Sequence, residues 1–207
     1  MEKPKFYDEA PVLNGENQTL QPGGYVCVIK KAVSQKSKAG NDMLVLLLDI
    51  AEGDKKGFFQ DRFDKNTKQD KKWDCVLRIV IDDESKSTDE RKKIAGRLKG
   101  SIASIEDSNP GFKFAWNEES LKDKIVGAEF GLEEYTAQDG STRTISKVRR
   151  LRSKESVLQN KVEMPQVRLL NNTYMDYNEY MEKKNNNEST EKNGEYITIE
   201  STDDLPF

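Results

Sequence analysis

Met43-Leu44-Val45-Leu46-Leu47-Leu48-Asp49-Ile50 is the stretch that decides the predicted fold. Seven of its eight residues are apolar. Because successive side chains of a strand point to opposite faces, this strand is apolar on both faces. We therefore expect it to be deeply buried, at a place where a curved sheet folds over itself.

Other segments rich in strand-forming residues lie on both sides of this stretch. A first strand is predicted at 25–33, before a turn at 35–41. A third strand is predicted to begin at 58–63, to break at the polar residues 64–72 and to resume at 73–81. Two further strands are predicted at 124–135 and 142–151, joined by a turn with an Asp-Gly hairpin signal at Asp139 and Gly140.

One helix is predicted between the third and fourth strands. Ser87-Thr88-Asp89-Glu90 has the pattern of a capping box. Apolar residues then recur at helical spacing over about 89–106, and Asn109-Pro110-Gly111 ends the helix. The aromatic segment 112–116 is predicted as a short strand or loop, with Trp116 in the core or as a lid over the helix.

This element order predicts a mainly β domain. Strand, strand, broken strand, helix, strand, strand is the order of the OB-fold, a five-stranded Greek-key barrel with a helix between its third and fourth strands. A generic α+β sandwich would give a similar order. We expect an extended N-terminal arm at 1–22, an OB-fold domain at 23–168, a flexible polar linker at 169–198 and a disordered acidic tip at 199–207.

Composition restricts the class of protein. The 207 residues include no histidine, which removes the commonest general base and metal ligand, so no cofactor or metal is expected. Cys27 and Cys75 lie in apolar strand-like runs and fit buried, reduced thiols. No apolar run approaches the roughly 20 residues that span a bilayer, and no secretion signal is recognised. A cytoplasmic protein without membrane contact is expected.

The net charge of −3 is distributed unevenly. Residues 188–207 contain six acidic residues and one lysine, whereas residues 143–168 contain eight basic residues and two glutamates. A basic body with an acidic tail is typical of a nucleic-acid binder whose tail lies outside its binding surface.

The chain ends in Asp203-Asp204-Leu205-Pro206-Phe207. This ending resembles the acidic C-terminal tip of bacterial and bacteriophage single-stranded DNA-binding proteins. The resemblance implies that these five residues recruit replication, recombination and repair proteins, and that the body coats single-stranded DNA without sequence specificity. Residues 38–45 and 121–127, with Glu133-Glu134-Tyr135, are similar to phage-encoded replication and recombination proteins of Gram-positive hosts, which implies a phage or prophage protein in a bacterial cytoplasm.

Single-strand binding needs aromatic faces for bases and cations along the phosphate path. On the strands and loops that an OB-fold uses for oligonucleotides, the candidate residues are Lys36, Lys38, Phe58, Phe59, Arg62, Phe63, Lys71, Lys72, Trp73, Arg143, Lys147, Arg149 and Arg150. Any of the phenylalanines could instead belong to the core, and any of the cations could be a solvated surface charge.

Two other functions stay open at this point. The chain could be a protein-interaction adaptor that uses the fold without DNA. It could also be a metal nuclease based on Asp82-Asp83-Glu84, although acids just before a helix also complement the helix dipole. The absence of histidine and of a Gly-rich phosphate loop favours a protein that is not an enzyme. A homo-oligomer is compatible with all these features.

Overall fold

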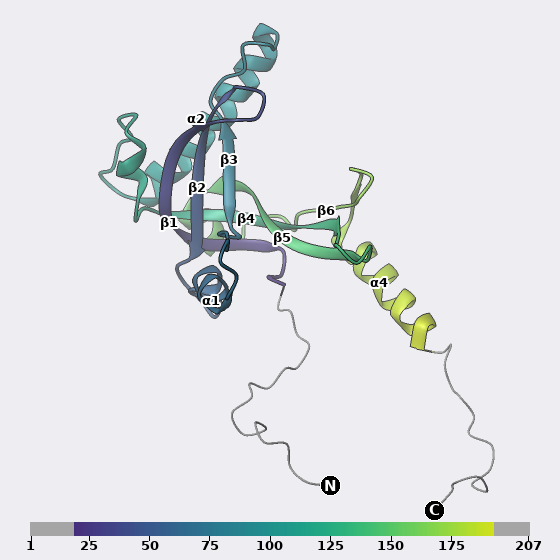
Figure 1. Ribbon diagram of the computed structural model, residues 1–207. Helices are drawn as coiled ribbons and strands as arrows, with labels where there is room; N and C mark the ends of the chain where they lie inside the picture. Colours follow the sequence, from purple (N-terminus) through teal and green to yellow (C-terminus); the bar gives the residue numbers. More distant parts are fainter. Residues whose placement is uncertain (1–18, 193–207) are drawn as a thin grey trace, which may run out of the picture.

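The computed structural model describes residues 19–192, and Figure 1 shows their arrangement. The protein is mainly β: seven strands form one mixed sheet, with helices around it. Residues 1–18 and 193–207 lie outside the described residues, and they include most of the expected arm and the whole acidic tip.

The first three strands form an antiparallel meander. β1 (Gly23–Lys36) pairs with β2 (Asp42–Ile50), and β2 pairs with β3 (Val76–Val80). In the first turn, Gly40 takes a left-handed conformation (φ 87°) that glycine adopts without steric cost. On β2, Leu46 and Leu48 lie in the main core, while Val45, on the opposite face, is also buried. The predicted burial of 43–50 on both faces is confirmed.

A long hairpin completes the sheet. β4 (Ile125–Thr136) pairs along one edge with β1 and along the other with β5 (Thr142–Arg152). Gly140 closes the turn between them with φ 81°, as the Asp-Gly signal predicts. The short β6 (Val167–Arg168) runs parallel to β4 and pairs with β7 (Tyr174–Met175). The strand order is β3-β2-β1-β4, with β5 on the far edge of β4.

β3 and β5 lie next to each other, but they form no hydrogen-bonded ladder within the described part of the chain. The sheet is therefore open along this seam.

α2 (Thr88–Ser108) begins at the predicted capping box. The Ser87 hydroxyl accepts a hydrogen bond from the Glu90 N–H (3.4 Å), and the Glu90 carboxylate accepts one from the Ser87 N–H (3.2 Å). Leu98 and Ile105 are its buried residues, so the predicted helix and its apolar stripe are confirmed. Two shorter helices, η1 (Glu118–Leu121) and α3 (Lys154–Leu158), follow. No helix between residues 19 and 192 is both long and apolar enough to cross a membrane.

The prediction of a strand at 58–63 is wrong, because these residues begin α1 (Phe58–Lys65). The Asp49 carboxylate at the end of β2 is buried and accepts the Phe59 N–H (3.0 Å), which holds the first turn of the helix against the sheet. Gly57 precedes the helix in a left-handed conformation (φ 76°). The third strand is confirmed only where it resumes, at β3.

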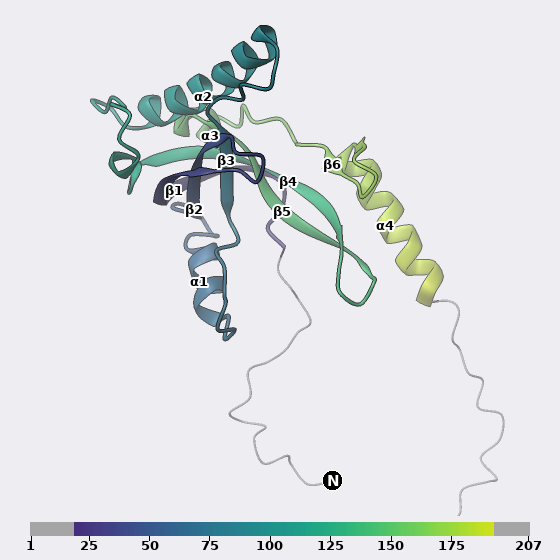
Figure 2. The ribbon, with the colours of Figure 1, turned by 45° about the horizontal axis from the view of Figure 1, so that its top comes forward.

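The segment expected to be a flexible linker also differs. It contains β7 and α4 (Tyr177–Lys192). Tyr180 is buried with Leu132 and Val167 in a second, smaller core, and the Tyr177 hydroxyl donates to the Gln21 side-chain oxygen (2.9 Å). The first turn of α4 is therefore part of the folded body. In Figures 1 and 2 the β4–β5 hairpin reaches out between α1 and α4.

Candidate nucleic-acid interface

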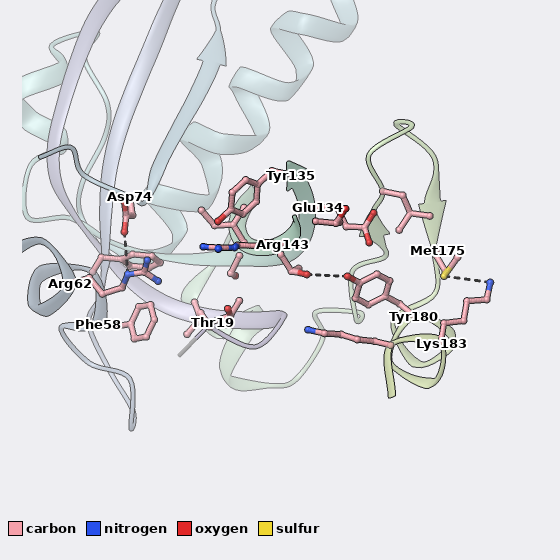
Figure 3. A pocket seen from close by; sticks show the side chains of 18 residues that line it. Thr19, Phe58, Arg62, Asp74, Glu134, Tyr135, Arg143, Met175, Tyr180 and Lys183 are labelled. Carbon is pink, nitrogen blue, oxygen red and sulfur yellow. Dashed lines mark hydrogen bonds and ion pairs between the residues drawn. The ribbon is translucent and has the colours of Figure 1, made fainter. Parts of the chain in front are cut away.

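A groove of about 790 Å³ opens between α1, the β4–β5 hairpin and the start of α4. Figure 3 shows its walls: Phe58 and Arg62 come from α1, Tyr135 and Arg143 from the hairpin, and Lys183 from α4. These residues are far apart in the sequence, and only Phe58, Arg62 and Arg143 among the five were predicted as site residues.

On the α1 wall, an aromatic ring and a cation lie together. The Arg62 guanidinium lies 5.6 Å from the centre of the half-buried Phe58 ring. Its Nε also pairs with an Asp74 carboxylate oxygen at 3.2 Å. Because both side chains of this ion pair are more than 40% exposed, the pair is solvent-screened and its arginine can turn to another anion.

Phe59 lies on the same helix but faces the core. It is 4% exposed, and its ring stacks on that of Phe130, with the centroids 5.9 Å apart. Phe59 therefore packs mainly in the core, although it also contributes to the groove lining, and base stacking by it stays a prediction. The half-buried Phe58 ring, on another face of the same helix, is the more accessible of the two. Phe58, Phe59 and Phe63 do not alternate as the residues of a strand would, because they lie on a helix.

The hairpin wall carries Arg143 and Tyr135. The Arg143 guanidinium pairs with the Asp139 carboxylate at 2.5 Å, within the turn. The Ser141 hydroxyl and N–H and the nearby Arg143 hold the pKa of Asp139 below its ordinary value, so Asp139 stays ionised. Tyr135 is 40% exposed and offers a second aromatic surface to the groove.

The α4 wall supplies residues that the sequence analysis missed. Lys183 and Lys184 both line the groove. Lys183 pairs with Glu179 (2.7 Å), while Lys184 has no hydrogen bond or ion pair to any other described residue. Below them the Tyr180 hydroxyl is hydrogen-bonded to the Thr144 hydroxyl (3.0 Å), and burial raises the pKa of Tyr180. The Tyr177–Tyr180 spacing was the available signal for this helix.

Three more predicted residues form a cluster beside α1, outside the groove. The Trp73 indole N–H donates to the Leu48 carbonyl (2.8 Å), and its half-buried ring packs against Phe63 and the core. The Lys71 ammonium lies 4.5 Å from the centre of the Phe63 ring. Trp73 thus has a structural role, and base stacking by it stays a prediction. Lys72 next to it is exposed.

The predicted basic stripe on β5 rests on two glutamates of β4. Glu129, almost fully buried, pairs with Arg150 (3.0 Å) and Arg152 (3.1 Å). Glu133 pairs with three cations, which are Lys147 (3.2 Å), Arg149 (3.6 Å) and Arg168 (3.5 Å). Arg152 and Arg168 were not among the predicted site residues. Five cations against two carboxylates leave this surface positively charged.

The remaining predicted cations lie at the β1–β2 turn. Lys36 pairs with Asp42 (2.9 Å), and both side chains are more than 60% exposed. Lys38 is exposed. Neither residue lines the groove between α1, the hairpin and α4.

The carboxylates of the nuclease alternative have protein partners. The carboxylate of Asp82 pairs with Arg91, and that of Asp83 accepts from the Ser85 hydroxyl (2.6 Å). These hydrogen bonds lower the pKa of both aspartates. Across residues 19–192, no three or more His, Cys, Asp or Glu side chains are grouped to hold a metal ion.

Cys27 and Cys75 are free thiols and are buried, as predicted, and burial raises the pKa of both.

The predicted partner-binding residues Asp203, Asp204, Leu205, Pro206 and Phe207 lie outside the described residues. No protein-family model matches this chain, and no curated protein is detectably similar to it in sequence.

Proposed function

We propose that this protein binds single-stranded DNA without sequence specificity, through an OB-fold. The strand arrangement supports the fold: a β1-β2-β3 meander, an antiparallel β1–β4 pair, α2 between β3 and β4, and β5 beside both β4 and β3. These are the order and neighbours of the OB-fold strands, with the β3–β5 seam left open.

The groove is the observation that carries the binding function. Its walls combine the aromatic side chains Phe58 and Tyr135 with four cations, Arg62, Arg143, Lys183 and Lys184. Among residues 19–192, only two carboxylates line it, those of Asp74 and Glu134. Aromatic faces stack on any base, and cations follow any phosphate backbone, so this combination suits a single strand of arbitrary sequence.

The stripe on β5 extends the cationic surface beyond the groove. Arg150 and Arg152 have side chains that are 61% and 40% exposed, and each shares the carboxylate of Glu129. A shared carboxylate holds two guanidinium groups in place while leaving donors free for phosphate oxygens. We infer that the strand leaves the groove along these arginines.

The acidic tip completes the proposal. Asp203–Phe207 resembles the tip of single-stranded DNA-binding proteins, and we propose that it recruits replication and recombination partners. Phe207→Ala should then abolish binding of such a partner and leave the affinity for oligo-dT unchanged, which a pull-down and a binding titration on the same variant can compare. Loss of DNA affinity in this variant would assign the ring to the DNA surface instead.

The test of binding is the fluorescence anisotropy of labelled oligo-dT as a function of salt. For a single strand, the logarithm of the binding constant should fall with the logarithm of salt concentration by about 0.7 per phosphate contacted. With several groove cations engaged, the slope should exceed about 2. Intact oligonucleotide after incubation with magnesium would argue against the nuclease. No binding at low salt would refute the proposal.

One observation favours an adaptor as the second candidate. Large apolar residues from the end of α3 to the start of β7 are exposed, namely Leu158 (60%), Met164 (55%), Leu170 (47%) and Tyr174 (58%). Exposed apolar side chains of this kind suit a protein partner. A chain that binds no oligonucleotide but binds a replication protein through this segment would support the adaptor.

A further inference from the structure

Trp116 has an unusual position. The sequence predicts it in the core or as a lid over the helix. Trp116 is instead 74% exposed, which makes it the most exposed large apolar residue in the described part of the chain. Its backbone is also in the left-handed region, with φ 61°. Bulky side chains rarely adopt this conformation, which persists where the surrounding structure enforces it and is concentrated at ligand-binding sites.

The neighbouring residues fix Trp116 from both sides. The Phe114 N–H donates to a Glu106 carboxylate oxygen (2.9 Å), and the Phe114 side chain packs against the main core. On the other side, Asn117 caps η1 by accepting the Glu119 N–H (3.1 Å). The Trp116 ring lies 5.6 Å from the Phe114 ring at an angle of 53°. The indole is therefore presented to solvent by an anchored segment.

The surroundings indicate which class of ligand fits. The residues on either side of Trp116 in the sequence, Ala115 and Asn117, are exposed and small or polar, and so are Lys113 and Glu119. A protein hot spot usually lies within a packed apolar patch that excludes water. Beside Trp116 the only ring in contact among the described residues is that of Phe114, which packs against the core, so the exposed indole face is free for another flat group. A nucleobase supplies such a group at any position of a strand.

We propose that Trp116 is a second contact point for single-stranded DNA, where its indole stacks on one base outside the groove. This inference rests on the proposed binding function and adds a site to it. In Figures 1 and 2 the loop between α2 and β4 lies on the opposite side of the body from α4 and the tip of the β4–β5 hairpin, which form two walls of the groove. A strand that reaches both the loop and the groove must therefore pass over the body of the protein. A long oligonucleotide should then bind more tightly than one that fills the groove alone.

Tryptophan fluorescence tests this contact directly, because the chain has two tryptophans. In Trp73→Phe, Trp116 is the only tryptophan and can be excited selectively over the seven tyrosines at the red edge of absorption. Saturating oligo-dT should quench most of its emission, since a stacked thymine quenches indole. In Trp116→Phe, Trp73 is the remaining tryptophan, so its emission reports separately on that half-buried ring, which is bonded to the Leu48 carbonyl. Unquenched Trp116 emission at saturation, with binding confirmed by anisotropy, would overturn the inference and leave the proposed function standing.

Removal of the ring gives an independent test. Trp116→Gly suits the left-handed backbone, so its melting temperature should equal or exceed that of the wild type. Its affinity for long oligo-dT should fall about 5- to 150-fold, the effect of losing one stacked base. Tyr174→Ala removes another exposed aromatic residue and should bind as the wild type does.

Unchanged affinity in Trp116→Gly would overturn the inference. If the wild-type protein binds no oligonucleotide at all, the proposed function fails and the inference fails with it.

Discussion

Lys183 and Lys184 give the sharpest test of the groove, because neither was predicted as a site residue from the sequence. Both line the groove from the second turn of α4. The first is held by Glu179, and the second has no hydrogen bond or ion pair to any other residue that the structure describes. The double variant Lys183→Gln, Lys184→Gln removes two positive charges while it keeps an unbranched polar side chain of similar helix propensity.

The size of the effect follows from the exposure of these lysines. A phosphate about 4 Å from an ammonium in bulk water contributes about 1 kcal/mol. Loss of two such contacts costs about 2 kcal/mol, which is roughly a 30-fold weaker affinity at low salt. The salt slope should fall by about 1.4, because each contact with a single strand contributes about 0.7. At 0.1 M salt the Debye length is about 10 Å, so the difference in affinity should shrink as salt is added.

Anisotropy of labelled oligo-dT over a salt series measures both quantities at once. The matched control is Lys92→Gln, Lys93→Gln, a lysine doublet on the exposed side of α2 that does not line the groove. This control removes the same total charge, so it corrects for the change in net charge. Equal slopes for both double variants would refute the assignment of α4 to the DNA surface.

Three further variants test the packing around the site. Phe59→Ala should lower the free energy of unfolding by about 3–5 kcal/mol in urea denaturation, because the buried ring leaves a cavity beside Phe130; a loss below 1 kcal/mol would contradict its core position. Trp73→Phe should cost about 1–3 kcal/mol of stability in the same assay, since the Leu48 carbonyl loses its donor; an unchanged stability would contradict this structural role. The ion pair with Lys113 lowers the pKa of Glu106. The stability that this pair gives the folded protein is therefore fully present above the ordinary pKa of 4.5, and it is lost as the pH falls through the lowered pKa. Acid denaturation should therefore show Glu106→Gln to be less stable than wild type near neutral pH, with the difference disappearing in acid; a difference that is constant with pH would contradict this role.

The β elements could be predicted from the sequence because their signals are local. Residues 43–50 are apolar on both faces, and β2 is buried on both faces. The capping box at Ser87 marks the start of α2 within one residue. The Asp-Gly pair in 137–141 marks the turn between β4 and β5, where Gly140 needs a left-handed conformation.

α1 could not be predicted in this way, because its causes are not local. Aromatic residues at 58, 59 and 63 favour a strand by propensity, which tertiary contacts readily override. The contact that favours the helix is the hydrogen bond from the Phe59 N–H to the Asp49 carboxylate, which lies ten residues earlier on a different element. The same bond turns Phe59 into the core and leaves Phe58 at the groove.

The groove was only partly predictable for a similar reason. Its α4 wall follows a polar segment whose sequence resembles a linker, and its helix has no apolar stripe beyond the first turn. Tyr180 fixes that turn by packing on Leu132 and Val167, residues that are close only in the folded chain. The cations of β5 were predicted, but their pairing with Glu129 and Glu133 depends on the β4–β5 register.

Photochemical crosslinking of oligo-dT to the full-length protein, followed by mass spectrometry of the peptides, tests the central claim most directly. Ultraviolet light joins a stacked thymine to the aromatic side chain that it contacts. If the groove binds the strand, crosslinks should be found at Phe58 and Tyr135, which line it from two different elements, and high salt should abolish them. Crosslinks confined to the far surface of α2, or bound oligonucleotide with no crosslink to either groove residue, would contradict the account.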